Sequence, residues 1–148
     1  AIEGATFLDA CSGSGAIGIE AVSRGAEHAT LIDRSHAAVA TALVNIKVLG
    51  DKSRRVEVLQ GDLLRTLRKL RSEGRTFDVV YLDPPYEDGP YEEALELLAE
   101  GLVTPRGYVT AEHFKKRELP ENILTLRRIR EVKVSDHRLT IYRNEVPS

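Results

Sequence analysis

The sequence has one cysteine, no methionine, no tryptophan and no long apolar run. A single cysteine, Cys11, excludes an internal disulfide and a metal site built from several cysteines. No apolar stretch approaches the roughly 20 residues of a membrane-spanning helix, and no charged and then apolar N-terminus indicates a signal peptide. These absences favour a reducing, cytoplasmic setting without membrane contact. Because there is no methionine, we expect that Ala1 is not the native start.

The chain also has little net charge of either sign. Its formal charge of -2 argues against a protein that coats nucleic acid, because phosphate binding requires an excess of Lys and Arg. The charge is uneven, however: residues 77–104 contain no Lys or Arg, whereas basic residues outnumber acidic ones from Lys115 onward. With 148 residues, 42% of them hydrophobic, and a mean hydropathy of -0.25, we expect one soluble globular domain over residues 1–148, and a monomer.

Apolar segments of strand type alternate with segments of helical period along most of the chain. This alternation is typical of an α/β fold with a parallel sheet covered by helices on both faces, and the last two segments predict an antiparallel hairpin. Strands are expected over residues 5–10, 29–33, 55–59, 77–82, 108–112, 124–134 and 138–143, and helices over residues 16–23, 37–49, 62–72 and 91–100, the second of which ends at Gly50.

Ligands of such sheets bind beyond the carboxyl ends of the strands, so the residues that follow each strand are the first candidates for a site. After the first strand, Gly13, Gly15 and Gly18 form a G-x-G-x-x-G pattern, which lets a ligand lie against the backbone and a helix N-terminus. Asp33 ends the second strand, 20 residues beyond Gly13, where a carboxylate can accept hydrogen bonds from ribose hydroxyls. Both features suit either a nicotinamide dinucleotide or S-adenosylmethionine. A nicotinamide-dependent dehydrogenase would need a second mononucleotide-binding half, for which the chain is too short.

The motif Asp83-Pro84-Pro85-Tyr86 follows the most apolar strand. Two prolines hold the backbone extended, so that the Asp83 carboxylate and the Pro84 carbonyl can both accept hydrogen bonds from an exocyclic amine. Tyr86 offers a ring on which a planar base can stack. The motif therefore predicts binding of a base amine whose lone pair is directed at an electrophile.

On these residues the chain resembles class I S-adenosylmethionine-dependent methyltransferases. The nearly unbroken run from Leu8 to Ala26 is similar, more narrowly, to the RsmD-type family, which methylates the exocyclic N2 of a guanine in 16S ribosomal RNA. The resemblance implies a Rossmann-like sheet of seven strands with the last one antiparallel, and 16S rRNA or the small ribosomal subunit as partner. It also implies a segment before the first strand that covers the cofactor and reaches the RNA, and we expect that this chain lacks it. Cys11 stands where the family usually has an aromatic residue, and Asp33 where Glu is common.

We predict two sets of site residues and no metal ligand. The catalytic set is Asp83, Pro84, Pro85 and Tyr86, and the set that binds S-adenosylmethionine is Asp9, Cys11, Ser12, Gly13, Gly15, Asp33, Arg34, Asp62 and Leu63.

Several alternatives stay open at this point. Asp62 either contacts the adenine amine or only caps the next helix, and Asp9 either orients the glycine loop or meets a ligand ammonium. Cys11 is expected to line the cofactor pocket rather than to attack a base, and His113 to be a satisfied histidine. Lys115, Lys116 and Arg117 are the basic residues expected nearest the substrate. Other candidate functions are an adenine-N6 methyltransferase, a cofactor-binding core without activity and a nicotinamide-binding fold.

Overall fold

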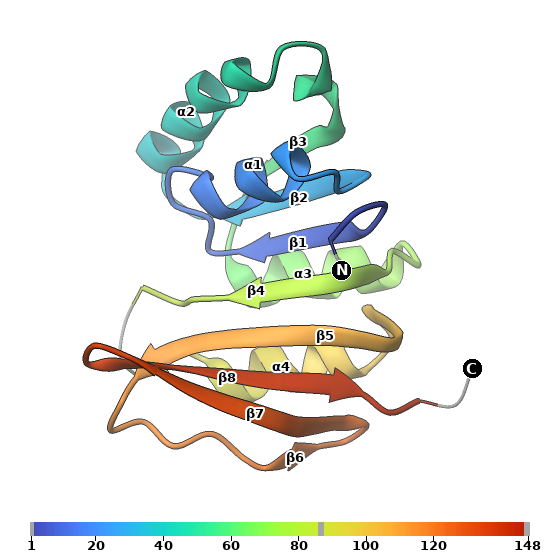
Figure 1. The fold of residues 1–148 in the computed structure, drawn as a ribbon, viewed down its shortest axis with the longest axis vertical. Helices are drawn as coiled ribbons and strands as arrows, with labels where there is room; N and C mark the ends of the chain where they lie inside the picture. The colour runs from blue at the N-terminus through green and yellow to red at the C-terminus, as the bar shows by residue number, and fades with distance from the viewer. Residues whose placement is uncertain (1, 86–87, 147–148) are drawn as a thin grey trace.

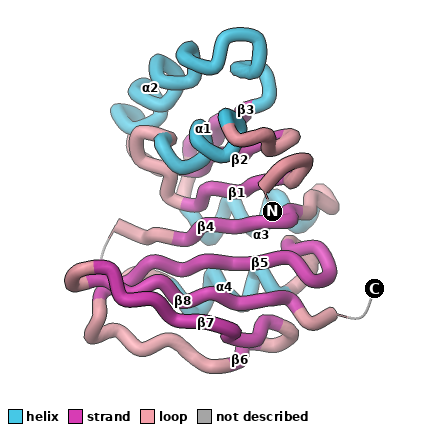
Figure 2. Tube along the Cα trace, in the orientation of Figure 1, coloured by secondary structure: helices cyan, strands magenta, loops and turns pink. Residues whose placement is uncertain are grey.

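The computed structural model describes residues 2–85 and 88–146 and forms one twisted sheet flanked by helices (Figures 1 and 2). Within these residues, no helix is both long and apolar enough to cross a membrane. The elements in chain order are β1 (Thr6–Ala10), α1 (Ala16–Ser23), β2 (His28–Asp33), α2 (His36–Asn45), the 3₁₀ segment η1 (Ile46–Arg55), β3 (Val56–Gln60), α3 (Leu63–Ser72), β4 (Phe77–Leu82), α4 (Tyr91–Ala99), β5 (Val103–Phe114), β6 (Asn122–Ile123), β7 (Leu126–Val134) and β8 (His137–Asn144).

The sheet has the strand order β3-β2-β1-β4-β5-β8-β7-β6. The first five of these strands are parallel, because a helical or 3₁₀ crossover joins each to the next in sequence. The chain reverses after β5, and β8 then pairs antiparallel with both β5 and β7. The carboxyl ends of β1, β2, β3 and β4 therefore lie next to one another on the same side of the molecule.

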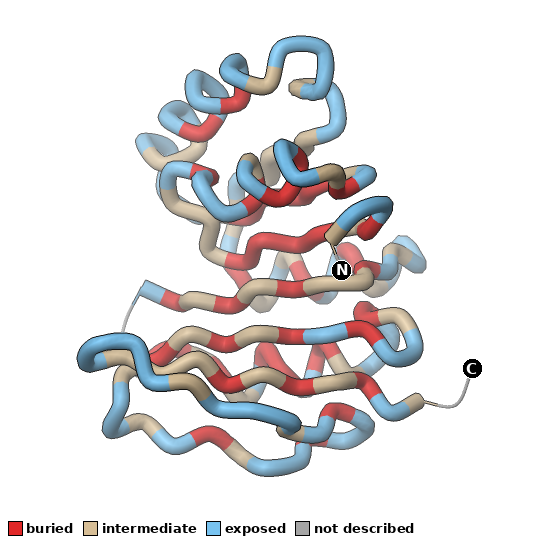
Figure 3. The backbone as a smooth tube through the Cα atoms, in the orientation of Figure 1, coloured by how far each residue is buried: buried red, intermediate tan, exposed pale blue. Residues whose placement is uncertain are grey.

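Helices cover both faces of the sheet. In the view of Figure 1, α1 lies in front of the sheet and α3 and α4 lie behind it. The larger core cluster joins α3 and α4 to the sheet through residues such as Leu67, Leu95 and Leu98, none of which has exposed surface. A smaller cluster packs α1 and α2 on the opposite face through Val22, Leu31 and other residues. Figure 3 shows how burial concentrates on the central strands, which are enclosed on both sides and are accordingly rich in apolar residues.

The predicted fold class is confirmed, including the antiparallel hairpin, and three details differ. Within residues 2–85 and 88–146 the sheet has eight strands rather than seven, because the two residues of β6 pair with the start of β7. Helix α2 ends at Asn45 and the chain continues in η1, in which Gly50 adopts φ 58° at a kink rather than directly ending the helix. Strand β5 runs from Val103 instead of residue 108, since Val103 pairs with Phe77 at the start of β4, and the register then shifts before Tyr108 pairs with Val79.

Candidate active site at the strand ends

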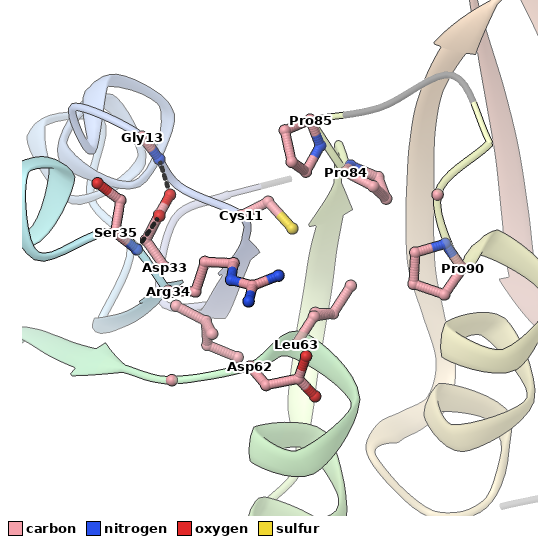
Figure 4. A pocket seen from close by; sticks show the side chains of 13 residues that line it. Cys11, Gly13, Asp33, Arg34, Ser35, Asp62, Leu63, Pro84, Pro85 and Pro90 are labelled. Carbon is pink, nitrogen blue, oxygen red and sulfur yellow. Dashed lines mark hydrogen bonds between the residues drawn. The ribbon is translucent and has the colours of Figure 1, made fainter.

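A cavity of about 370 Å³ opens at the carboxyl ends of β1 to β4 (Figure 4). This volume lies in the range of pockets that hold small ligands. Its walls come from segments far apart in sequence, which are the glycine loop, the ends of β2 and β3, and the prolines after β4. The lining residues are Cys11, Gly13, Ile32, Asp33, Arg34, Ser35, Gly61, Asp62, Leu63, Pro84, Pro85, Gly89 and Pro90.

The glycine loop between β1 and α1 is tied to the neighbouring strand. The backbone N–H groups of Cys11 and Ser12 both donate to the carbonyl of Ile32, at 2.9 and 2.8 Å. Gly15 caps α1 with φ 83°, a conformation that side-chain-bearing residues rarely adopt. Gly18 is required for a different reason, because an added Cβ there would lie 2.1 Å from Cδ2 of Leu31. The glycines thus permit a tight turn and close packing of α1 on the sheet.

Asp33 holds the loop and the start of α2 together. One of its carboxylate oxygens accepts from the Gly13 N–H at 2.8 Å and the other from the Ser35 N–H at 2.9 Å. Ser35 in turn caps α2 by accepting from the Ala38 N–H at 3.1 Å. Each carboxylate oxygen can accept a further hydrogen bond, so Asp33, which lines the cavity, can still receive hydroxyl groups of a ligand.

Asp62 caps α3, since its carboxylate accepts from the Arg65 N–H at 3.0 Å. This confirms the capping role, and Asp62 also lines the cavity beside Leu63. Figure 4 shows the Arg34 guanidinium pointing into the same cavity. The cavity therefore combines carboxylates, a cation and apolar walls.

Three residues predicted to bind the cofactor do not line this cavity. Asp9 is 1% exposed and accepts from the Gly18 N–H at 3.3 Å, as expected if it orients the glycine loop. Burial raises the pKa of Asp9 to about 7. Gly15 caps α1, and the hydroxyl oxygen of Ser12 is buried without a partner among the described residues. Their contact with a ligand stays a prediction.

Cys11 lines the cavity as predicted, with φ 73°. Burial, together with the surrounding carboxylates, raises the pKa of its thiol to about 12. The thiol is therefore protonated near neutral pH, which disfavours attack on a base.

The backbone of the proline motif follows directly after the end of β4. The N–H of Asp83 donates to the carbonyl of Ala10 at 3.3 Å, and Pro84 and Pro85 line the cavity opposite the glycine loop. Burial raises the pKa of Asp83 to about 6, with a further upward effect from Glu112 and a downward one from His137. Tyr86, predicted to stack on the base, lies outside the described residues.

Sequence reasoning missed Glu112 as a site neighbour. Its side chain accepts from the Tyr81 hydroxyl, and its second oxygen lies 2.8 Å from Nδ1 of His137. The available signal was its place at the end of the strand predicted over residues 108–112. Ile32, Ser35, Gly61, Gly89 and Pro90 were also missed as lining residues, although each lies at or within a few residues of a strand end or helix start.

One further expectation is settled by contacts. His113 is 2% exposed and its ring nitrogens lie 2.7 Å from the Thr140 hydroxyl and 3.1 Å from the Phe114 carbonyl, which confirms a satisfied histidine. Arg117 forms an ion pair with Glu92 of α4. Within the described residues, no group of three or more His, Cys, Asp or Glu side chains could hold a metal ion.

The site fits an adenosine-containing cofactor. Asp33 offers acceptors for ribose hydroxyls, Ile32 and Leu63 offer apolar walls for a base, and the glycine loop admits close approach of a ligand to the backbone. The buried Ser12 hydroxyl oxygen without a partner is a further polar group that a ligand could satisfy.

Comparison with known proteins places this fold and site in a family context. The model of the family described as "Conserved hypothetical protein 95" matches residues 1–143. The "Putative rRNA methyltransferase YlbH" of Bacillus subtilis is 35% identical over 82% of this chain and 66% of its own length. The "Ribosomal RNA small subunit methyltransferase D" of Buchnera aphidicola is 32% identical over 82% of this chain and 63% of its own length. The chain thus spans about two thirds or less of these curated relatives.

The structure of the "Putative methyltransferase yhhF" from Escherichia coli superposes with a TM-score of 0.88 at 28% identity, covering 99% of this chain and 80% of that one. The similarity therefore extends over the whole sheet and its helices.

Proposed function

The chain belongs to the family of conserved hypothetical protein 95, the RsmD family, and we propose that it is an RNA methyltransferase that uses S-adenosyl-L-methionine. We further propose that it methylates the exocyclic N2 of a guanine in 16S rRNA, as naked RNA or within the small ribosomal subunit. The observation that carries the proposal is that Gly13 and Asp33 share one cavity with Pro84 and Pro85. Groups suited to a nucleoside cofactor thus share a cavity with Pro84, and Asp83, which does not itself line the cavity, directly precedes it.

The cofactor would be held by the glycine loop and the ends of β2 and β3. In this proposal the Asp33 carboxylate accepts the ribose hydroxyls while it keeps the Gly13 loop in place. Ile32 and Leu63 exclude water from the base, and Asp62 accepts from its amine. When bound, S-adenosylmethionine supplies a methyl group activated by a positively charged sulfur.

The amine would be held by the proline motif. The Asp83 carboxylate and the Pro84 carbonyl each accept one N–H of the base amine, which leaves the nitrogen lone pair directed into the cavity. Since the pKa of Asp83 is raised to about 6, its carboxylate is ionised at pH 7.5 and is a stronger base than an ordinary aspartate, so it can take up the proton that the amine loses. Tyr86 remains the predicted stacking residue. Catalysis would be mainly proximity and orientation.

Binding is tested first. We expect S-adenosylhomocysteine to bind in a calorimetric titration, and NAD not to bind under the same conditions. Binding of NAD alone would support the nicotinamide alternative and contradict the proposal.

Transfer is tested on the protein with methyl-labelled cofactor and a panel of 30S particles, naked 16S rRNA and DNA. We expect N2-methylguanine in the rRNA. Asp83→Ala should abolish transfer and leave the affinity for S-adenosylhomocysteine nearly unchanged, whereas Asp83→Asn, which keeps one acceptor oxygen, should retain a residual rate. Label in N6-methyladenine would favour the adenine alternative, and undiminished turnover by Asp83→Ala would exclude the assigned role.

A further inference from the structure

Glu112 lies beside Asp83 on the neighbouring strand. In the parallel ladder of β4 and β5, Leu82 pairs with Ala111, so the next residues along the two strands are Asp83 and Glu112. The side chains of Tyr81 and Glu112 lie on the same face of the sheet, opposite to the face that buries Leu82 and Ala111. Glu112 is thus next to the residue proposed to hold the amine.

Both oxygens of the Glu112 side chain are held by partners. The Tyr81 hydroxyl donates to one, and Nδ1 of His137, at the start of β8, lies 2.8 Å from the other. The side chains of Glu112 and His137 are only 26% and 31% exposed. The backbone carbonyl of Glu112 accepts from the Tyr91 hydroxyl of α4 at 2.8 Å, which anchors this point of β5 from the other face. Little freedom remains for the carboxylate to turn away.

The charges near Asp83 come from several elements. Glu112 of β5 raises the pKa of Asp83 and His137 of β8 lowers it, in addition to burial, which has the largest effect. Asp9 and Cys11 at the end of β1, Tyr81 of β4 and Tyr91 of α4 also lie within the electrostatic reach of Asp83, because it raises their pKa values. Glu112 and His137 shift the pKa of Asp83 in opposite directions. Their side chains are also in direct contact with each other.

We propose that Glu112 and His137 form a pair of positioning residues that sets the pH range in which Asp83 can accept the proton of the target amine. The proposal rests on the proposed function, because it assigns the pair a role through Asp83. When His137 is protonated, the pair is close to neutral and Asp83 experiences little repulsion. When His137 loses its proton, the fixed Glu112 charge makes Asp83 more basic. The contact with Glu112 raises the pKa of His137, so its positive charge persists to a higher pH than that of an ordinary histidine.

The primary test measures the titration of Asp83 directly, by ¹³C NMR of the aspartate carboxyls in the protein, with assignment from Asp83→Asn. Glu112→Gln keeps an acceptor for Tyr81 and removes the negative charge, so we expect the Asp83 titration to move down by about one pH unit. His137→Asn keeps a donor near Glu112 and removes the positive charge, so we expect the titration to move up. Opposite shifts from two neighbouring neutral substitutions are not expected of a merely structural contact.

The matched control is Glu96→Gln, which removes a carboxylate from the exposed face of α4 and should leave the Asp83 titration unchanged. Unchanged Asp83 titration in His137→Asn would overturn the proposal, as would an upward shift in Glu112→Gln. If Glu112→Gln does not fold, the predicted upward shift in His137→Asn decides the question alone.

A second readout separates this inference from the proposed function. The acid limb of the kcat/KM profile for methyl transfer should move with the Asp83 titration in both variants. Transfer with a profile that neither variant moves would overturn the inference and leave the proposed function standing. Absence of transfer by the wild-type chain on every substrate, together with no binding of S-adenosylhomocysteine, would instead overturn the proposed function.

Discussion

Asp33→Ala removes the acceptor that ties the glycine loop to the start of α2. Two backbone N–H groups, of Gly13 and Ser35, lose a charged partner at 2.8 and 2.9 Å. Since Asp33 is partly exposed, water can replace part of each interaction, and about 1 kcal/mol for each bond is a reasonable magnitude. The free energy of unfolding should fall by about 2 kcal/mol, and the melting temperature by about 6 °C for a chain of this length.

The same substitution tests the ligand role of Asp33. Loss of two hydroxyl contacts to a carboxylate costs about 3 kcal/mol, so the affinity for S-adenosylhomocysteine should fall about 100-fold in a calorimetric titration. Glu27→Ala, at an exposed carboxylate in the turn before β2, is the matched control and should change neither quantity by more than about 0.5 kcal/mol. Unchanged affinity in a folded Asp33→Ala protein would refute the assigned cofactor contact, and unchanged stability would refute the tie between loop and helix.

Three further substitutions test individual contacts within the fold. Gly18→Ala places a Cβ against the fully buried Leu31 and should lower the free energy of unfolding by about 1–3 kcal/mol in urea titrations; a neutral effect would show that Leu31 can move aside. Burial acts to raise the pKa of Asp78, but hydrogen bonds outweigh it and hold the pKa below its usual range, so the stabilisation is present at neutral pH and lost as the pH falls. The free energy of unfolding of Asp78→Asn should therefore lie below that of wild type by a margin that shrinks from pH 7 to pH 3. A margin that does not depend on pH would contradict this. Because the pKa of Asp9 is raised to about 7, ionisation of its carboxyl opposes folding. In thermal melts, the free energy of unfolding of Asp9→Asn relative to wild type should therefore increase by about 2–4 kcal/mol between pH 4 and pH 8. No increase would mean that the charge of Asp9 is well solvated.

The parallel part of the fold could be predicted from the sequence because each element has a local signal. The segments that became α1 and β4 were predicted with their observed bounds, since a glycine loop opens the first and a continuous apolar run forms the second. Strand β6 had no such signal. Its two residues extend only because β7 lies beside them, and a contact of that kind does not depend on the composition of the segment.

The site could be predicted where function depends on backbone position and not where it depends on contacts across the sheet. Gly13, Asp33 and Pro84 lie at or just after the carboxyl ends of strands and were expected close together for that reason. The contact between Glu112 and His137 joins residues 25 positions apart through the register of β5 and β8. No period of the sequence fixes that register before the chain has paired.

The two edges of the sheet also affect how the molecule behaves in a crowded solution. On one side β6 pairs only with Leu126 and Arg127, and the rest of β7 is an open edge that carries charged side chains such as Arg130, Glu131 and Lys133. On the other side it ends at β3, a strand of five residues where Glu57 is held by Arg75 at 3.0 Å. Short edges and charged side chains both hinder the addition of a further strand. The charges on the open part of β7 and the short length of β3 therefore hinder two sheets from joining side by side and aggregating.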